Sequence, residues 1–181
     1  MMIVLIAFAT CHGSTQGVAE RIGQRIQARG IDAEVHPVSE VADLGRYDAV
    51  VLGSAIHNMK WLPEASRFAQ REAAALRERP TWLFSVSSIG DQESMLSPRV
   101  ARVLRAMKKE TPEITALRSA IHPHEHRNFA GAIARTDWSA AGSVFLRIMG
   151  GRYGDHRNWT AIDSWAASIA ADLAAAPTRT A

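Results

Sequence analysis

Apolar residues recur along this chain with two spacings, one typical of buried strands and the other typical of amphipathic helices. Residues 2–9 form an unbroken apolar run, as a strand that is covered on both faces requires. From Gln16 the spacing becomes helical, and Gly30 is placed to end the helix. The apolar positions that define this helix are Val18, Ile22 and Ile26. The chain therefore opens with a buried strand that leads directly into a helix.

The same alternation continues along the rest of the chain. Further strands are predicted at residues 31–36, 48–55, 81–87 and 128–134. Further helices, each with an apolar face, are predicted at residues 64–78, 100–107 and 162–173. Strands that alternate with helices in this way form an open parallel sheet with helices on both faces.

The polarity of the strands indicates their order. Residues 31–36 alternate apolar and polar positions, as an edge strand does, whereas residues 48–55 are mostly apolar and belong in the centre. We therefore expect an α/β fold with a five-stranded parallel sheet of order 2-1-3-4-5. Ligands of such folds bind beyond the carboxyl ends of the strands, so three loops become candidates for a site. These loops are residues 10–15, 54–61 and 85–93.

Length and composition fit a single domain. The chain has 181 residues, of which 47% are hydrophobic and 22% are charged, an ordinary balance for a protein with a substantial core. We assign residues 1–176 to one domain and residues 177–181 to a frayed tail. Residues 135–158 do not fit the alternation, and we interpret them as an insertion before the last helix.

Charge and cysteine content narrow the classes of function. A net charge of +3 is too small to indicate nucleic-acid binding, although it mildly favours an anionic ligand or surface. The single cysteine excludes an intramolecular disulfide and a CxxC redox motif. The N-terminal apolar run lacks a basic flank and is too short to span a bilayer, so we interpret it as a strand rather than as a leader. A cytoplasmic location is the resulting expectation.

The loop after the first strand, "TCHGST", carries the parts of a phosphate site. Thr10, Ser14 and Thr15 supply hydroxyl groups, and Gly13 lets the backbone approach a ligand closely. The start of the following helix adds free N–H groups and the positive end of the helix dipole. Because no Lys follows the glycine and the GxGxxG spacing is missing, we predict a phosphomonoester rather than a triphosphate or a dinucleotide. A turn and helix cap without a ligand is the alternative.

Two other side chains of this loop have open roles. Cys11 has no second cysteine with which to form a disulfide, so we interpret it as a small filler rather than as a reactive thiol. His12 either adds positive charge near the phosphate or is simply exposed.

Several motifs resemble a known family. T-x-x-G-x-T after a buried strand resembles the flavodoxin phosphate loop, which holds the 5′-phosphate of FMN. "YDAVVLGSAIH", residues 47–57, resembles the third flavodoxin strand and the loop that lies against the isoalloxazine ring. The segments "FSVS" (84–87), "FAGAI" (129–133) and "RIMGG…D…W" (147–159) resemble the menaquinone-dependent protoporphyrinogen IX dehydrogenases. This similarity follows the chain in order over nearly its whole length.

The resemblance implies an FMN site built from the three loops. The phosphate would be held by Thr10, His12, Gly13, Ser14 and Thr15. One side of the ring would be lined by Ser54, Ala55, Ile56, His57 and Asn58, and the other by backbone groups of Ser87, Ser88, Ile89 and Gly90. His57 is the titratable side chain beside the ring that we would test for a catalytic role, and an exposed loop residue is its alternative interpretation.

The ring loops depart from one feature of the family. Electron-carrier flavodoxins enclose the ring between a Trp and a Tyr, and neither loop has an aromatic residue at the expected place. Trp61 follows a few residues later and is equally well interpreted as a packing residue at a helix start. An open ring face suits an enzyme that must admit a substrate.

The segment "HPHEH", residues 122–126, places three histidines and one glutamate close together in the sequence. Such ligands suit a transition metal. However, Pro123 disturbs regular strand geometry and no distant partner is suggested. We therefore interpret the segment as a solvated loop before the last strand and predict no metal site.

The insertion carries apolar residues at helical spacing, namely Trp138, Ala141, Phe145, Ile148 and Met149. It is either a helix packed on the edge of the sheet or a surface that meets a membrane or a hydrophobic substrate. Arginines that could pair with porphyrin propionates surround it, namely Arg135, Arg147, Arg152 and Arg157. In the dehydrogenases that the chain resembles, this long loop is needed for activity.

These implications favour an FMN-dependent oxidoreductase that oxidises protoporphyrinogen IX in haem biosynthesis and passes electrons to a quinone. The expected partners are a hydrophobic quinone or tetrapyrrole and the inner face of the cell membrane. An electron carrier of the flavodoxin type and an NAD(P)H:quinone reductase of the same fold stay open as alternatives. The missing ring aromatics, the basic charge and the apolar insertion count against the carrier, and no nicotinamide motif is visible for the reductase.

Overall fold

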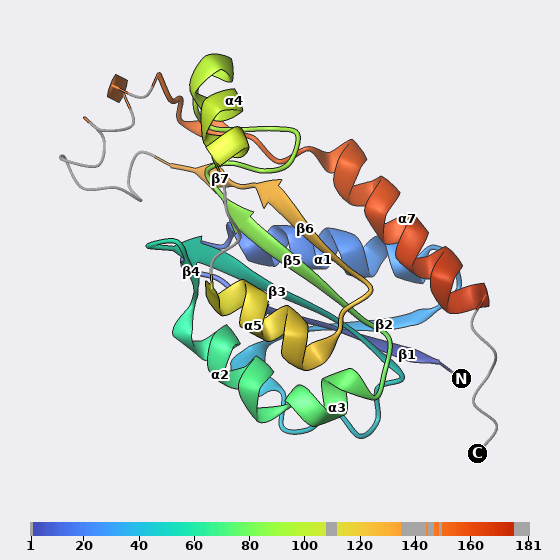
Figure 1. The fold of residues 1–181 in the computed structure, drawn as a ribbon. Helices are drawn as coiled ribbons and strands as arrows, with labels where there is room; N and C mark the ends of the chain where they lie inside the picture. The colour runs from blue at the N-terminus through green and yellow to red at the C-terminus, as the bar shows by residue number, and fades with distance from the viewer. Residues whose placement is uncertain (1, 108–111, 135–143, 145–146, 149, 176–181) are drawn as a thin grey trace.

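The computed structural model describes residues 2–107, 112–134, 144, 147–148 and 150–175. Its main element is a parallel sheet that runs through the middle of the molecule (Figure 1). The strands are β1 (Ile3–Ala9), β2 (Asp32–Pro37), β3 (Ala49–His57), β5 (Thr81–Ser87) and β6 (Glu125–Ala130). Their spatial order, β2-β1-β3-β5-β6, confirms the predicted 2-1-3-4-5 arrangement, because β4 (Lys60–Trp61) pairs only with β3.

Helices cover both faces of this sheet (Figure 1). One face packs against α1 (Ser14–Gln27) and α7 (Trp159–Ala175). The other face packs against α2 (Pro63–Arg71), α3 (Ala73–Arg77) and α5 (Pro112–Ile121), together with the short 3-10 helix η1 (Val38–Glu40). The remaining described helix, α4 (Pro98–Met107), stands beyond the end of the sheet.

Strand β1 shows why the N-terminal run is apolar without interruption. Val4, Ile6 and Phe8 point into the core beneath α1 and α7, whereas the intervening residues face the opposite core. Residues 4–9 are all buried. A strand with a core on each side needs apolar side chains at both alternating sets of positions.

The register brings the carboxyl ends of the strands to one edge of the sheet. Ala9 pairs with Ser54, Ser54 pairs with Ser85, and Ser87 pairs with Ala130. The segments that follow β1, β3, β5 and β6 therefore start side by side. We call this end of the sheet the carboxyl edge; it lies at the upper left in Figure 1.

Several element boundaries differ from the predicted ones. The predicted helix at residues 64–78 is divided at Glu72 into α2 and α3. Helix α5 was not predicted. The third strand extends to His57 and turns back into β4 as an antiparallel hairpin, so residues 54–57 are not a loop. The last strand is also shifted, since β6 ends at Ala130, and a separate β7 (Ala132–Ile133) pairs with β8 (Gly154–Asp155).

The interpretation of residues 122–126 as a loop is wrong at its C-terminal end, because β6 begins at Glu125. Pro123 precedes the strand, so its missing N–H costs the sheet nothing. His124 stacks on Trp82, with ring centroids 4.9 Å apart, and His126 Nε2 lies 2.8 Å from Ser85 Oγ. Within the described ranges, no three His, Cys, Asp or Glu side chains gather as a metal site. In the same ranges, every helix is too short or too polar to cross a membrane.

An ion-pair cluster joins α1 to α7 on one face of the sheet. Arg21 donates from Nε and Nη2 to the two carboxylate oxygens of Asp163, at 2.6 and 2.8 Å, and Arg25 Nη2 lies 2.6 Å from Oδ2. Such pairs contribute about 1 kcal/mol or less, whereas each fully buried aliphatic side chain contributes about 1.5–3 kcal/mol. Both helices bury several aliphatic side chains completely, among them Ile22 and Ile162. The apolar core therefore dominates the stability of this helix pair.

Asp163→Asn should lower the free energy of unfolding by about 1 kcal/mol at pH 7, because both ion pairs are lost. The hydrogen bonds from Arg21 and Arg25 hold the pKa of Asp163 well below its usual range. The stabilisation is therefore fully present above the unfolded-state pKa of about 3.9, and it decreases as the pH falls towards the folded-state pKa.

Urea unfolding of both proteins at neutral and acidic pH measures this effect. Asp172→Asn is a matched control, since Asp172 lies exposed on the same helix. A difference between wild type and Asp163→Asn that is as large at about pH 3 as at pH 7 would contradict the prediction.

Candidate functional site

Loop 10–15 connects the carboxyl end of β1 to α1 by a single tight turn. Gly13 adopts φ +80°, a left-handed conformation that favours glycine, and α1 begins at the next residue. The Gly13 N–H donates to Thr10 Oγ1 at 3.0 Å, and the Gly13 carbonyl accepts the first helical hydrogen bond, from the Gly17 N–H. The first turn of α1 therefore points its unused N–H groups into the space beyond the carboxyl edge.

Each of the three hydroxyl groups of this loop still has a hydrogen that it can donate to a ligand. Thr10 Oγ1 accepts from Gly13, and Ser14 Oγ accepts from the Ala132 N–H at 2.8 Å. Thr15 is 1% exposed, and its buried Oγ1 has no hydrogen-bond partner among the described residues. A hydroxyl group that only accepts retains its own hydrogen. This donor set, together with the helix N–H groups, fits an anion such as a phosphate.

The β3–β4 hairpin forms the second part of the site. Its two turn residues, Asn58 and Met59, have φ values of 49° and 64°, as a tight two-residue turn requires. Ser54 is buried at the base, where its Oγ donates to the Ala55 carbonyl at 2.8 Å and accepts from the Leu62 N–H at 3.0 Å. The Ser54 hydroxyl is therefore fully used within the hairpin.

The other predicted ring residues of the hairpin are accessible to different degrees. Ala55 and Ile56 are half-buried, whereas His57 and Asn58 are exposed. Together with Met59, these two exposed residues form the end of the hairpin that extends past the carboxyl edge.

The segment 87–95 forms the third part and is held by its own hydrogen bonds. Ser87 Oγ donates to the Ile89 carbonyl at 2.9 Å, and the Met95 N–H donates to the Ser88 carbonyl at 2.9 Å. A Cβ at Gly90 would overlap the backbone of Ala130, so this residue faces β6. Its N–H donates to the Glu93 carbonyl. The loop is thus preformed.

Arg105 holds this segment from outside. From α4, its Nε and Nη2 donate to the carbonyl groups of Gly90, Gln92 and Glu93 at 2.8–2.9 Å. The sequence pattern marks the apolar face of α4 but does not reveal this role, because the acceptors are backbone groups of a loop.

Trp61 is not available to stack on a ligand at this site. It is 2% exposed, and its indole N–H donates to Ser85 Oγ at 2.8 Å. Its ring lies edge-on to His126, with centroids 6.5 Å apart. The accessible parts of the hairpin and of residues 87–95 therefore contain no Phe, Tyr or Trp side chain.

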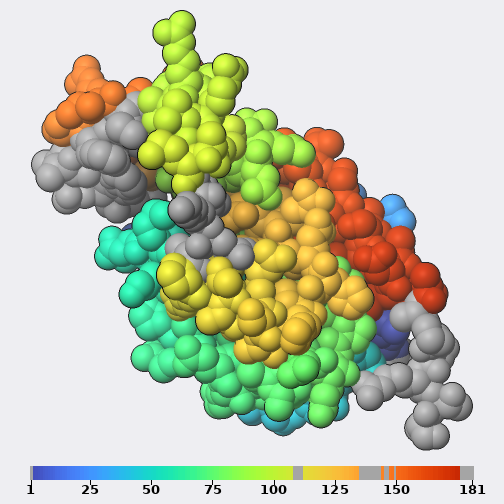
Figure 2. All heavy atoms as spheres, viewed as in Figure 1, coloured from blue at the N-terminus to red at the C-terminus, as the bar shows by residue number. Residues whose placement is uncertain are grey.

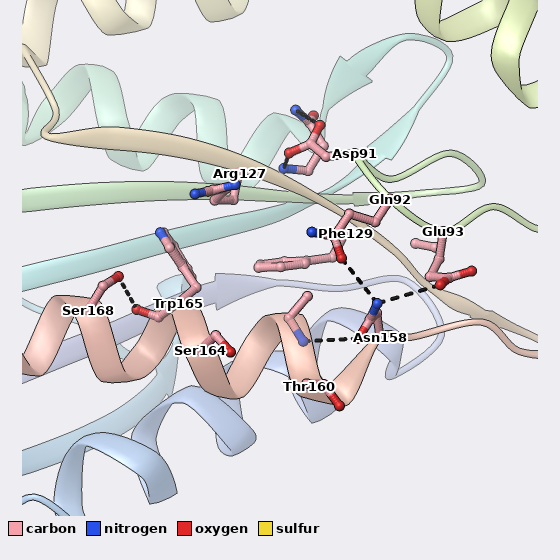
Figure 3. A pocket seen from close by; sticks show the side chains of 13 residues that line it. Asp91, Gln92, Glu93, Arg127, Phe129, Asn158, Thr160, Ser164, Trp165 and Ser168 are labelled. Carbon is pink, nitrogen blue, oxygen red and sulfur yellow. Dashed lines mark hydrogen bonds between the residues drawn. The ribbon is translucent and has the colours of Figure 1, made fainter.

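A groove of about 440 Å³ lies elsewhere, between β6 and α7 (Figure 3). Its apolar wall includes Phe129 and Trp165, and its rim is polar. Much of the rim is paired internally, because Asp91 accepts from Asn128, and Asn158 Nδ2 lies 3.2 Å from Gln92 Oε1. None of the residues predicted to bind the cofactor lines this groove.

Three of the four arginines predicted to meet a substrate lie within the described residues. Arg147 and Arg152 are exposed in the insertion, and Arg135 lies outside the described residues. Arg157 instead lies against α1, where it forms an ion pair with Asp155, with Nη2 and Oδ2 2.7 Å apart.

A comparison of the sequence with protein families matches the flavodoxin domain over residues 5–146. The chain belongs to the flavodoxin domain family. Comparison with curated proteins finds no match. The family is consistent with flavin-dependent electron transfer or oxidoreductase chemistry.

Solved structures of low sequence identity share the fold of this flavodoxin-family protein. An archaeal flavodoxin is 15% identical with a TM-score of 0.55, and the match covers 96% of this chain and 99% of that one. A mutant flavodoxin from Pseudomonas aeruginosa is 12% identical with a TM-score of 0.58, and the match covers 96% of this chain and 99% of that one. Rubredoxin oxygen:oxidoreductase from Desulfovibrio gigas is 13% identical with a TM-score of 0.62, and the match covers 96% of this chain but 36% of that one.

Thr15→Val should raise the free energy of unfolding of the ligand-free protein by about 1 kcal/mol, because it removes a buried hydroxyl group that has no partner. Urea unfolding measures the change. Ser14→Ala serves as the opposite control, since it leaves the Ala132 N–H without its acceptor and should lower stability by about 1 kcal/mol. The prediction fails if both variants are destabilised equally.

Proposed function

We propose that this flavodoxin-family protein is an FMN-dependent oxidoreductase. The unpartnered Thr15 hydroxyl and the donors that Thr10 and Ser14 retain fit the oxygen atoms of a phosphomonoester. His12 and Gly13 complete the loop that would hold the phosphate. A bound flavin would supply the redox chemistry by accepting hydride or electrons from one substrate and giving them to another.

The remaining predicted residues would orient the ring. In this proposal, Ala55, Ile56, His57 and Asn58 of the hairpin lie on one side, and the backbone of Ser87, Ser88, Ile89 and Gly90 lies on the other. Ser54 would act indirectly, since its hydroxyl group braces the hairpin. The internal hydrogen bonds of both segments would position these groups before the cofactor arrives.

The burial of Trp61 is the observation that favours an enzyme over an electron carrier. With its indole N–H bonded to Ser85 and its surface covered, this residue does not cap a ring. A ring face that no Trp or Tyr covers leaves room for a substrate. His57, exposed beside this face, is the titratable group that we would test as a proton donor or acceptor.

The exposed apolar residues favour a hydrophobic substrate or acceptor. Among the described residues, the large apolar side chains that are more than half exposed belong to the hairpin, α4 and the insertion: Met59, Val103, Met107, Val144 and Ile148. Figure 2 shows α4 projecting at the top of the molecule and the coloured residues of the insertion at its upper left. Apolar groups next to cations are typical of surfaces that meet a lipid interface.

We therefore propose protoporphyrinogen IX as the substrate and a membrane quinone as the acceptor. The exposed guanidinium groups of Arg147 and Arg152 would pair with the propionates of the tetrapyrrole. The protein would work in the cytoplasm, in contact with the inner face of the membrane. An electron carrier and an NAD(P)H:quinone reductase are the alternatives that the same fold allows.

Anaerobic assay of the FMN-loaded protein tests the proposal directly. We expect flavin-free protein to take up FMN and then to oxidise protoporphyrinogen IX over many turnovers only when a quinone is present, since without an acceptor each bound flavin can take up only two electrons. FMN uptake without this activity, but with electron transfer from a reductase, would identify a carrier. Quinone reduction that requires NAD(P)H would identify the quinone reductase, and failure to bind FMN would refute the proposal as a whole.

Arg147→Glu and Arg152→Glu should each raise the KM for protoporphyrinogen IX on the order of ten-fold, because an attractive pair becomes a repulsive one. The flavin content should stay at the wild-type level. Arg77→Glu is the matched control, since Arg77 is an exposed arginine on α3. Unchanged kinetics in both insertion variants would show that these arginines do not bind the substrate.

A further inference from the structure

Arg157 lies just before α7, and its guanidinium group is held on two sides. Nε and Nη2 donate to the two carboxylate oxygens of Asp155, at 2.8 and 2.7 Å. The guanidinium carbon lies 4.4 Å from the centroid of the Trp159 ring. With 18% of its side chain exposed, Arg157 has a defined orientation that a surface arginine lacks.

The segment that carries Arg157 is fixed to the same part of the fold as loop 10–15. The His156 N–H donates to the Gly131 carbonyl at 3.1 Å, and Asp155 pairs with Ala132 in the β7–β8 ladder. Ala132 in turn donates its N–H to Ser14 at the start of α1. The chain thus connects Arg157 to the first turn of α1 through consecutive hydrogen bonds.

The third nitrogen, Nη1, points to that first turn. A Cβ built on Gly17 would lie 2.5 Å from Nη1, so the guanidinium group occupies the space of the missing side chain. Glycine weakens a helix relative to alanine, and here it leaves room for this contact. Among the described residues, Nη1 has no hydrogen-bond acceptor.

The electrostatics of this place favour a bound anion. The N-terminal end of a helix is positive and therefore repels a cation. Asp155 binds the Nε and Nη2 edge of the Arg157 guanidinium group, away from Nη1, and partly offsets its positive charge. The hydrogen bonds from Arg157 keep the pKa of the Asp155 carboxyl below its usual range. The other nearby cation, Arg21, has its own partner in Asp163. An anion at the first turn would give Nη1 the acceptor that it lacks.

We propose that Arg157 is a positioning residue for the cofactor phosphate and makes this chain select a phosphorylated flavin over an unphosphorylated one. The inference rests on the proposed FMN site and deepens it. It also assigns Arg157 to the cofactor rather than to the substrate, unlike Arg147 and Arg152. The hydroxyl groups and N–H groups of loop 10–15 would hold the phosphate, and Arg157 would add a charge-assisted hydrogen bond from Nη1.

Titration of flavin-free protein with FMN and with riboflavin tests the inference by flavin fluorescence, without an activity assay. Arg157→Gln should raise the Kd for FMN on the order of ten-fold and leave the Kd for riboflavin unchanged, because only FMN carries the phosphate. Added salt should weaken FMN binding more in wild type than in this variant.

Two further variants distinguish the effect of positive charge in general from the effect of the position of Arg157. Gly17→Ala retains Arg157 but moves Nη1 away from the first turn, so it should raise the Kd for FMN several-fold without affecting riboflavin. Arg29→Gln removes one exposed positive charge just past the far end of α1 and should change neither Kd.

Each result has a distinct meaning. If wild type binds neither flavin, the proposed function fails. If wild type binds FMN and Arg157→Gln keeps the wild-type ratio of the two Kd values, the inference is overturned while the proposed function stands. Equal loss of both flavins in Arg157→Gln, with wild-type selectivity in Gly17→Ala, would reveal a merely structural role and would also overturn it.

Discussion

Burial of the central strands on both faces is the constraint on which the rest of this molecule depends. β1 lies between β2 and β3 and contributes side chains to both cores. A strand in this position has little freedom to shift, because a slip by one residue would exchange the two sets of buried side chains. The positions where β1, β3 and β5 end are therefore determined by the cores. The candidate site is built on those ends.

Loop 10–15 and the segment before α7 show how distant parts of the chain combine at that edge. Ser14 binds the N–H of Ala132, and a Cβ at Gly131 would lie 2.8 Å from Ser14 Oγ. The segment that leaves β6 therefore packs directly on the start of α1, and it brings Asp155 and Arg157 with it through β8. A rigid support of this kind is what a small anion site requires.

The elements that were predicted well have strong local signals, and those predicted poorly do not. The turn at residues 10–15 was predicted from its glycine and the helix that follows it, and Gly13 does lie directly before α1 with a left-handed backbone. The hairpin after β3 was expected to be a loop, because Asn58 and Met59 are not a common sequence for a tight turn with positive φ. The short α5 was not predicted, because its apolar face is narrow and becomes evident only where it packs into the core. The start of β6 was misplaced, because its first residues are polar and become a strand only by pairing with β5.

The sequence by itself determined the α/β class, the strand order and the turn at residues 10–15, because each depends on the spacing of apolar, polar and glycine residues within one segment. Only the tertiary structure decided the contacts of Trp61, Arg105 and Arg157. Their partners are Ser85, the carbonyl groups of a loop, and Gly17, which lie between 12 and 140 positions away along the chain. Contacts over such separations depend on how the sheet and its helices pack, and no local spacing records them.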